Sequence, residues 1–430
     1  MTKNDNGPRR VRDEGLARPA NGLRLMVLSV AALCAPSTAQ AAPLTFDAAL
    51  SLADQSAPSL AAKRADSEAA SQWRMAAGRL PDPKVRLGLD NFPTSGPSAG
   101  RFGPDSQTQA SIGFIQDIPS NAKRRAERQR ADADIDAAKS ASDVQGRNVK
   151  LNTALAWMDL FYAQKRLAAL DEIDRALEPL RNNAPSQLAA GTARPAETLE
   201  VEQLTATLGD RRAELKAMVG KARAELIRWT GDEQAEPAGD APDMSIDEKA
   251  LRTALVDHPM VRAYDASGRQ ADADRDLAKA GKSPDWSLDL AVQRRDPAFG
   301  DMVTAGVTIS LPLFGSTRQD PVIAARTQTA RRVRYEREDA VRSLTAQLDA
   351  DLADHVMHHD RWVRSEGTLA PLAKKRAELE RSSYAAGNAS LSNVLSAMLA
   401  LAEAKIEALN REAEVKRDAV RITLTYGSAP

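Results

Sequence analysis

The chain has 430 residues, with 59 Lys and Arg against 59 Asp and Glu, and only 4% of its residues are aromatic. The zero net charge argues against a nucleic-acid partner, which requires a basic surface. A single cysteine allows neither a disulfide framework nor a zinc site built from paired cysteines, and no cofactor is expected. Beyond an amino-terminal leader there is no apolar run of about 18 residues, so no membrane-spanning helix is expected. Alanine-rich, charged chains with few aromatic residues are typical of long, closely packed helices.

Residues 1–41 have the pattern of a secretory signal peptide. Several arginines precede an apolar stretch at 25–35, and the small residues at 39–41 provide a cleavage site. Cys34 follows Leu33, where a lipoprotein signal requires a small residue, so we expect no lipidation. The mature protein is therefore predicted to be exported.

The rest of the sequence is predicted to be a tandem duplication. Four landmarks recur in the same order at offsets of about 200 residues. The pairs are Ala57-Pro58 and His258-Pro259, Pro81-Asp82 and Pro284-Asp285, Ile118-Pro119 and Leu311-Pro312, and Ala189-Ala190-Gly191 and Ala385-Ala386-Gly387. We assign residues 42–230 to the first repeat, 231–243 to a polar linker, 244–427 to the second repeat and 428–430 to a tail.

Each repeat contains two segments in which apolar and polar residues alternate. They lie at 84–90 and 106–118 in the first repeat, and at 286–293 and 303–311 in the second. Alternation with a period of two predicts strands that have one apolar and one polar face. The alternative is a pair of ordinary hairpins that cover a water-soluble core.

Long helices are predicted to follow each strand pair. The stretches at 119–191 and 312–387 contain few helix breakers, and their apolar residues keep helical spacing. About 70 residues of helix span roughly 100 Å. Each repeat is therefore expected to form a helical hairpin about 100 Å long that turns back at a glycine. The narrow apolar seams favour lateral assembly as coiled coils.

The four predicted strands could allow an exported chain to cross a membrane as part of a β-barrel. If the apolar strand faces meet lipid, the sheet must close into a barrel, because unpaired edge amides cost several kcal/mol each in lipid. Bacterial barrels need at least about eight strands. We therefore expect a homotrimer that shares one 12-stranded barrel, continued by an α-helical tunnel. The expected fold class is mainly α with a small β part.

The sequence resembles the TolC family of outer-membrane efflux proteins over residues 44–427. The resemblance rests on the tandem halves, the strand-pair ends at 118–119 and 311–314, and the run YAAGNASLSNVLSA at 384–397. The segment IGFIQDIPSNAKR at 112–124 is most similar to the heavy-metal branch. The resemblance implies an outer-membrane trimer that extends into the periplasm. Its tips would bind a periplasmic adaptor, or membrane fusion protein, that joins it to an inner-membrane pump of the resistance-nodulation-division type.

The resemblance also implies residues that gate the tunnel. Glu197 matches a position that is often acidic in the family, and Tyr384 matches the tyrosine that hydrogen-bonds to it. Asn393 and Ser396 stand where the family has pore-constricting aspartates, and Glu200 could supply the missing charge. The alternative is that Glu197 and Tyr384 only cap or solvate a helix turn. The expected adaptor-docking residues at the tips are Gly191, Thr192, Gly387, Asn388 and Leu395.

Three of the four histidines lie close together in the sequence. His355 and His359 are one helical turn apart, a spacing at which two imidazoles can bind one metal ion, and His358 lies beside them. Such a cluster would suit a metal exporter. The alternative is a solvated helix face, because two ligands without a fixed carboxylate bind a metal weakly.

The predicted function is an exit duct for heavy-metal cations or other small toxic compounds. The alternative is a periplasmic coiled-coil adaptor or scaffold protein, although an adaptor is expected to have one hairpin and many more strands. An enzyme is not expected, because the sequence contains no GxSxG, HExxH or phosphate-loop motif.

Overall fold

The computed structural model describes residues 44–102, 107–190 and 194–427, except for the side chains of residues 184, 187, 197 and 198. The first elements in chain order are α1 (Phe46–Ser56), α2 (Pro58–Ala76), β1 (Lys84–Asp90), β2 (Gln109–Ile118), α3 (Asn121–Ala189) and α4 (Pro195–Thr230). The later ones are α5 (Glu248–Ala254), a 3₁₀ turn (Leu255–Asp257), α6 (Pro259–Ala280), β3 (Asp285–Arg294), β4 (Met302–Ser310), α7 (Gln319–Arg364), a π turn (Ser365–Leu369), α8 (Ala370–Ala385) and α9 (Leu391–Tyr426).

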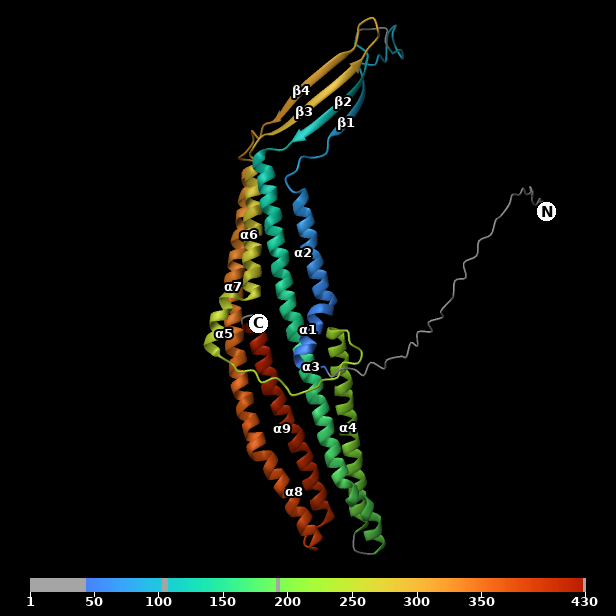
Figure 1. The fold of residues 1–430 in the computed structure, drawn as a ribbon, viewed down its shortest axis with the longest axis vertical. Coiled ribbons are helices and arrows are strands. Elements are labelled where there is room, and N and C mark those ends of the chain that lie inside the picture. The colour runs from blue at the N-terminus through green and yellow to red at the C-terminus, as the bar shows by residue number, and fades with distance from the viewer. Residues whose placement is uncertain (1–43, 103–106, 191–193, 428–430) are drawn as a thin grey trace, which may run out of the picture. The chain divides into compact units, whose positions relative to one another are not determined.

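The four strands form one antiparallel sheet in the order β1-β2-β3-β4. Helices α2 and α6 lead into this sheet and α3 and α7 leave it, so all four helices meet the same end of the strands (Figure 1). A mostly helical chain with one small antiparallel sheet confirms the fold class predicted from the sequence.

The helical hairpins differ from the prediction in the length of one arm. Helix α3 has 69 residues, which correspond to about 100 Å, whereas α4 has only 36 residues. Helix α4 stops before Gly231, whose φ of 72° belongs to the left-handed region that ends helices. The half of α3 nearer the sheet packs on α2 and α6 instead (Figure 1). The paired arms of the hairpin are therefore about half as long as expected.

The long helix of the second half is interrupted by the π turn at Ser365–Leu369. Pro371 lies in the first turn of α8 and has no backbone N–H to donate. A widened turn just before this proline is a usual way for a helix to absorb an extra residue. The sequence pattern predicted an unbroken helix here, because its apolar spacing continues on both sides of the turn.

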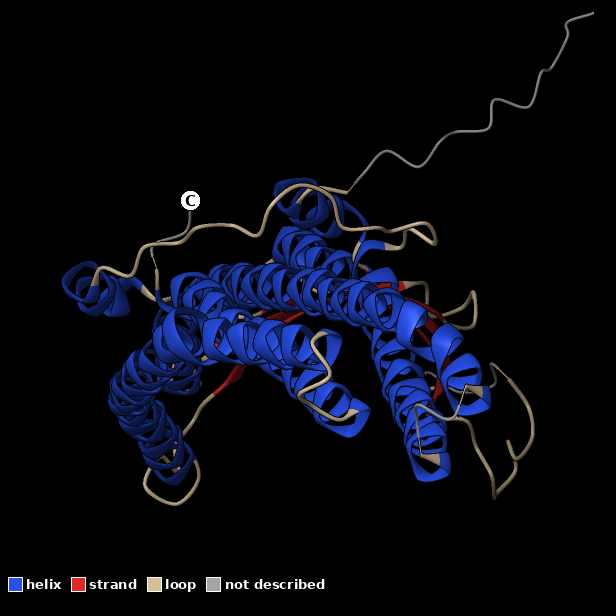
Figure 2. Ribbon diagram, turned by 90° about the horizontal axis from the view of Figure 1, so that it is seen from below, coloured by secondary structure: helices blue, strands red, loops and turns tan. Residues whose placement is uncertain are grey.

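The molecule has three levels along its length: the sheet, the helices next to the sheet, and the helices of the far half. Within each level the elements lie side by side. Next to the sheet the helices contact one another in the order α2-α3-α6-α7. In the far half the main contacts follow the order α4-α3-α9-α8, and α4 also contacts α9. Viewed from below, the helices form a curved layer (Figure 2). In the sheet and in both helical levels, elements of the first half of the chain occupy one edge and elements of the second half occupy the other.

Two large apolar clusters hold the helices together. In one of them, the fully buried Trp157 of α3 contacts Phe46 and Phe161, with ring centroids 5.6 and 5.0 Å away. The Trp157 Nε1 donates a hydrogen bond of 2.8 Å to the carbonyl oxygen of Leu44. The second cluster joins α3, α4, α8 and α9 in the far half. Across the described ranges, no helix is both long enough and apolar enough to cross a membrane.

Candidate functional site

One face of the sheet carries apolar side chains on every strand. The register aligns them in rows across the sheet, such as the row of Val85, Phe114, Leu290 and Ala305. These side chains have no cover, and Val85 exposes 69% of its surface. A continuous exposed apolar surface of this kind indicates contact with lipid or with another protein.

The opposite face of the sheet is mainly polar. The Lys84 side chain donates a hydrogen bond of 2.7 Å to Asp117 across the first strand pair. The side chains of Gln293 and Thr304 are hydrogen-bonded at 2.8 Å across the last pair. The four alternating segments predicted from the sequence therefore form strands with two unlike faces, as expected.

Both edges of the sheet are open. Within the described chain, β1 pairs only with β2, and β4 pairs only with β3. The outward N–H and C=O groups of these edges can bind water, but in lipid each would need a backbone partner. A second copy of the chain could provide that partner, because β4 of one copy is free to pair with β1 of the next.

Three solved structures of outer-membrane proteins share this architecture. CusC, whose crystal structures concern its folding and transmembrane channel formation, aligns with a TM-score of 0.74 at 14% identity, over 89% of this chain and 92% of that chain. The CmeC outer membrane channel of Campylobacter jejuni gives a TM-score of 0.73 at 13% identity, over 89% and 85%. The outer membrane protein VceC of Vibrio cholerae gives 0.68 at 17% identity, over 89% and 96%. The chain has the TolC-like fold. No family model and no curated protein matches the sequence.

The far end of the TolC-like fold contains the turn between α8 and α9. Gly387 has a φ of 77°, which L side chains rarely adopt. The Gly387 N–H donates to the Tyr384 carbonyl at 3.0 Å and the Asn388 N–H donates to the Ser383 carbonyl at 2.9 Å, so the turn is a Schellman motif. Ser390 then caps α9 by accepting a hydrogen bond from the Asn393 N–H at 3.3 Å.

The predicted gate residues have different surroundings in this region. Tyr384 is half-buried against the far-half cluster, and Asn393 and Ser396 are exposed on α9. Glu200 is half-buried on α4. The side chain of Glu197, like the docking residues Gly191 and Thr192, lies outside the described part of the chain.

Among the docking residues, Gly387 and Asn388 are exposed at the turn. Leu395 is only 5% exposed, because it packs in the cluster between α9 and the neighbouring helices. Its side chain is therefore part of the core of the chain and is not accessible to an adaptor. Helical spacing places Leu395 one turn from Leu391, which is also buried, and this spacing is the sequence signal for a core position.

The three clustered histidines do not converge. The rings of His355 and His359 are 6.4 Å apart between centroids, whereas His358 points to α9, where its Nδ1 lies 2.7 Å from a carboxylate oxygen of Asp418. Burial lowers the pKa of His355, which favours its neutral form. In the described part of the chain, no group of three or more His, Cys, Asp or Glu side chains is arranged to bind a metal ion.

The fourth histidine, His258, joins the start of α6 to the end of α9, a role that was not predicted from the sequence. Its Nδ1 accepts a hydrogen bond of 3.2 Å from the Met260 N–H and so caps α6. Its Nε2 lies 2.9 Å from the Thr425 carbonyl at the end of α9, and Arg147 donates to the same carbonyl at 2.5 Å. Burial and the nearby charges of Arg147 and Arg262 lower the pKa of His258. The signal in the sequence was the His-Pro pair, which is typical of a helix start.

Acid should destabilise the protein through His258. Its pKa is lowered in the folded chain, so its contribution to stability is complete above the unfolded value of about 6.5 and is lost as the pH falls below that value. The expected loss is at most about 1.4 kcal/mol per pH unit. Urea unfolding between pH 7.5 and 5 would measure it. His258→Asn keeps a capping oxygen without a titrating ring, and an unchanged pH slope in this variant would contradict the assignment.

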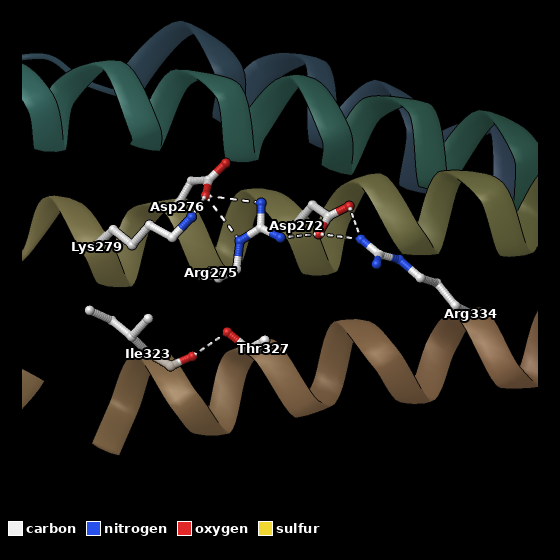
Figure 3. Close-up of polar contacts among 7 residues, drawn as sticks. All are labelled: Asp272, Arg275, Asp276, Lys279, Ile323, Thr327 and Arg334. Carbon is white, nitrogen blue, oxygen red and sulfur yellow. Dashed lines mark hydrogen bonds and ion pairs between the residues drawn. The ribbon is translucent and has the colours of Figure 1, made fainter. Parts of the chain in front are cut away.

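A ladder of ion pairs connects α6 to its neighbour α7 near the sheet. Figure 3 shows Arg275 between Asp272 and Asp276 of α6, with Arg334 of α7 directed at Asp272. The distances are 2.7 Å from Arg275 to Asp272 and 3.3 Å from Arg334 to Asp272. Partly exposed pairs of this kind contribute about 0–1 kcal/mol each. Of the pairs described, only Arg334 with Asp272 joins α7 to α6, because the pairs of Arg275 lie within α6.

Proposed function

We propose that this protein is the outer-membrane exit duct of a tripartite efflux pump. The observation that carries the proposal is the exposed apolar face shared by all four strands, bounded by two open sheet edges. A lipid environment accounts for both features, because it covers the apolar face and requires the edges to pair. The channels with the same fold support this proposal.

The duct would be a homotrimer. Strand β4 of each copy pairs with β1 of the next, so three copies close a barrel of twelve strands in the outer membrane, above the minimum of about eight. The polar sheet face then lines the barrel, and the helices continue the passage through the periplasm.

The partners of the duct follow from this arrangement. The turns farthest from the sheet meet a periplasmic adaptor, which connects the duct to an inner-membrane pump of the resistance-nodulation-division type. The cargo is heavy-metal cations or other small toxic compounds. The similarity of residues 112–124 to the heavy-metal branch supports the metal cargo.

Membrane fractionation and conductance test the duct. The full chain, expressed with its leader, should remain in the outer-membrane fraction after a carbonate wash. The purified protein should then produce discrete single-channel currents in a planar bilayer. Release by carbonate, as expected of a soluble adaptor or scaffold, would refute the proposal.

We further propose that Glu197 and Tyr384 hold the tunnel closed at its far end. Tyr384 supports this role because it lies at the end of α8, against the far-half cluster. Glu197→Ala and Tyr384→Phe should each raise the single-channel conductance severalfold. The matched control is Tyr335→Phe, which removes the hydroxyl of an exposed tyrosine on α7. Equal conductance in all variants would show that neither residue closes the tunnel.

A further inference from the structure

The four strands carry six charged side chains on the polar face of the sheet. They are Lys84, Arg86, Asp90, Asp117, Asp285 and Asp289. Asp117 accepts a hydrogen bond of 2.7 Å from Lys84, and Asp90 lies 3.9 Å from Arg86. Asp285 forms an ion pair with Lys123, which belongs to the first turn of α3. Five of the six side chains therefore have a partner of opposite charge.

The sixth side chain, Asp289, has no cationic partner in the described part of the chain. It lies at the middle of β3, where the register places it between Ile115 of β2 and Gly306 of β4. The basic residue of the same row, Lys84, is two strands away and donates to Asp117. A carboxylate without a partner is costly to remove from water. Asp289 therefore requires a water-filled space on this face of the sheet.

The neighbouring strand β4 leaves space beside this carboxylate. Strand β4 contains no charged residue. Gly306, which lies directly across from Asp289, has no side chain that could cover it. A Cβ added at Gly306 would have only the Asp289 Cβ within 4 Å, at 3.8 Å. The next residues of β4 on the same face are Thr304 and Thr308, which are small and uncharged. The Asp289 carboxylate is therefore open toward the interior of the proposed barrel.

We propose that Asp289 makes the barrel selective for cations. This inference rests on the proposed trimer and assigns the residue that determines which ions pass. The symmetry of a closed trimer places its three Asp289 side chains at one level of the barrel. A ring of carboxylates in a pore attracts cations and repels anions. Because the other charges on the polar face of the strands are paired, this ring sets the sign of the field at its level. That sign suits a cargo of metal cations.

Reversal potentials of single channels in a KCl gradient test this role. The parent channel should pass K⁺ in preference to Cl⁻. Asp289→Asn keeps the shape of the side chain without its charge and should lower the permeability ratio of K⁺ to Cl⁻ severalfold, whereas Asp289→Lys should reverse the preference. The ratio of the parent should also fall between about 0.1 M and about 1 M salt, because the Debye length shrinks from about 10 Å to about 3 Å.

Two further variants test whether the effect depends on a charge at this place. Asp240→Asn makes the same change at an exposed carboxylate in the segment between α4 and α5, outside the sheet, and should leave the permeability ratio unchanged. Thr308→Asp, added to the Asp289→Asn chain, returns a carboxylate to the polar face two residues along β4 from Gly306. This double variant should recover most of the parent ratio.

The outcomes separate this inference from the proposed duct. Channels that have the same permeability ratio in the parent and in Asp289→Asn overturn the role of Asp289 but leave the duct intact. A parent channel that prefers Cl⁻, or whose ratio is the same at low and high salt, also overturns the role of Asp289, and this readout needs no variant. A double variant that stays as unselective as Asp289→Asn has the same consequence. Absence of any current from the parent overturns both proposals.

Discussion

Val307→Lys should prevent stable insertion of the protein into lipid. Val307 lies near the middle of β4, is 62% exposed and belongs to the apolar face. A lysine at the midplane of a bilayer costs about 2–4 kcal/mol in each copy of a barrel protein. Flotation of the reconstituted protein with lipid vesicles measures the inserted fraction, which we expect to fall at least tenfold.

Thr308→Lys is the control for this experiment. Thr308 is the next residue of the same strand, so its side chain points to the polar face, where it is level with Ser287 of β3. A lysine there should leave insertion nearly unchanged. Equal losses in the two variants would mean that the two faces of the sheet do not differ in their environment, and the lipid-facing assignment would fail.

Trp157→Ala should cause a large loss of stability, because it removes the central side chain of an apolar cluster. The ring is fully buried, stacks on Phe161 and contacts Phe46 by its edge. Removing a buried tryptophan leaves a cavity and costs about 3–5 kcal/mol. Urea unfolding followed by far-ultraviolet circular dichroism would show the loss as a lower midpoint with a similar slope.

Two further variants should lose less stability than Trp157→Ala. Trp157→Phe keeps most of the ring but loses the hydrogen bond to Leu44, so it should cost less than the alanine variant. Val256→Ala changes an exposed side chain and should stay within about 0.5 kcal/mol of the parent. If Trp157→Ala unfolds at the same urea concentration as Val256→Ala, the cluster around Trp157 does not hold α1 to α3.

The strands were predictable because the alternation of apolar and polar residues in the sequence reflects the different environments of the two sheet faces. Residues such as Leu288 and Leu290 alternate with polar neighbours, and this alternation specifies two unlike faces without knowledge of the partner strands. The turn at Gly387 was also predictable, since only glycine adopts its backbone conformation at little cost.

The lengths of the paired arms, the environment of the docking residue Leu395 and the role of His258 were harder to predict from the sequence. Helical periodicity shows which residues of α3 are buried but not which helix covers them, and α6, far away in sequence, covers the near half. Leu395 was assigned to docking from its place in a motif, although its spacing from Leu391 indicated the core. His258 depends on Thr425, more than 160 residues later, a contact that no local pattern reveals.

The length of α3 has a consequence for how such a protein can change during evolution. Helix α3 extends from the sheet to the far turn in one piece, and the run from α7 through the π turn to α8 covers nearly the same length. An insertion in one of these runs alone would move its tip past that of its neighbour and misalign every contact beyond it. Insertions and deletions should therefore occur in matched pairs, one in each half, and in multiples of about seven residues that preserve the buried faces. The widened turn at Ser365–Leu369 is the place where a single unmatched residue can be absorbed.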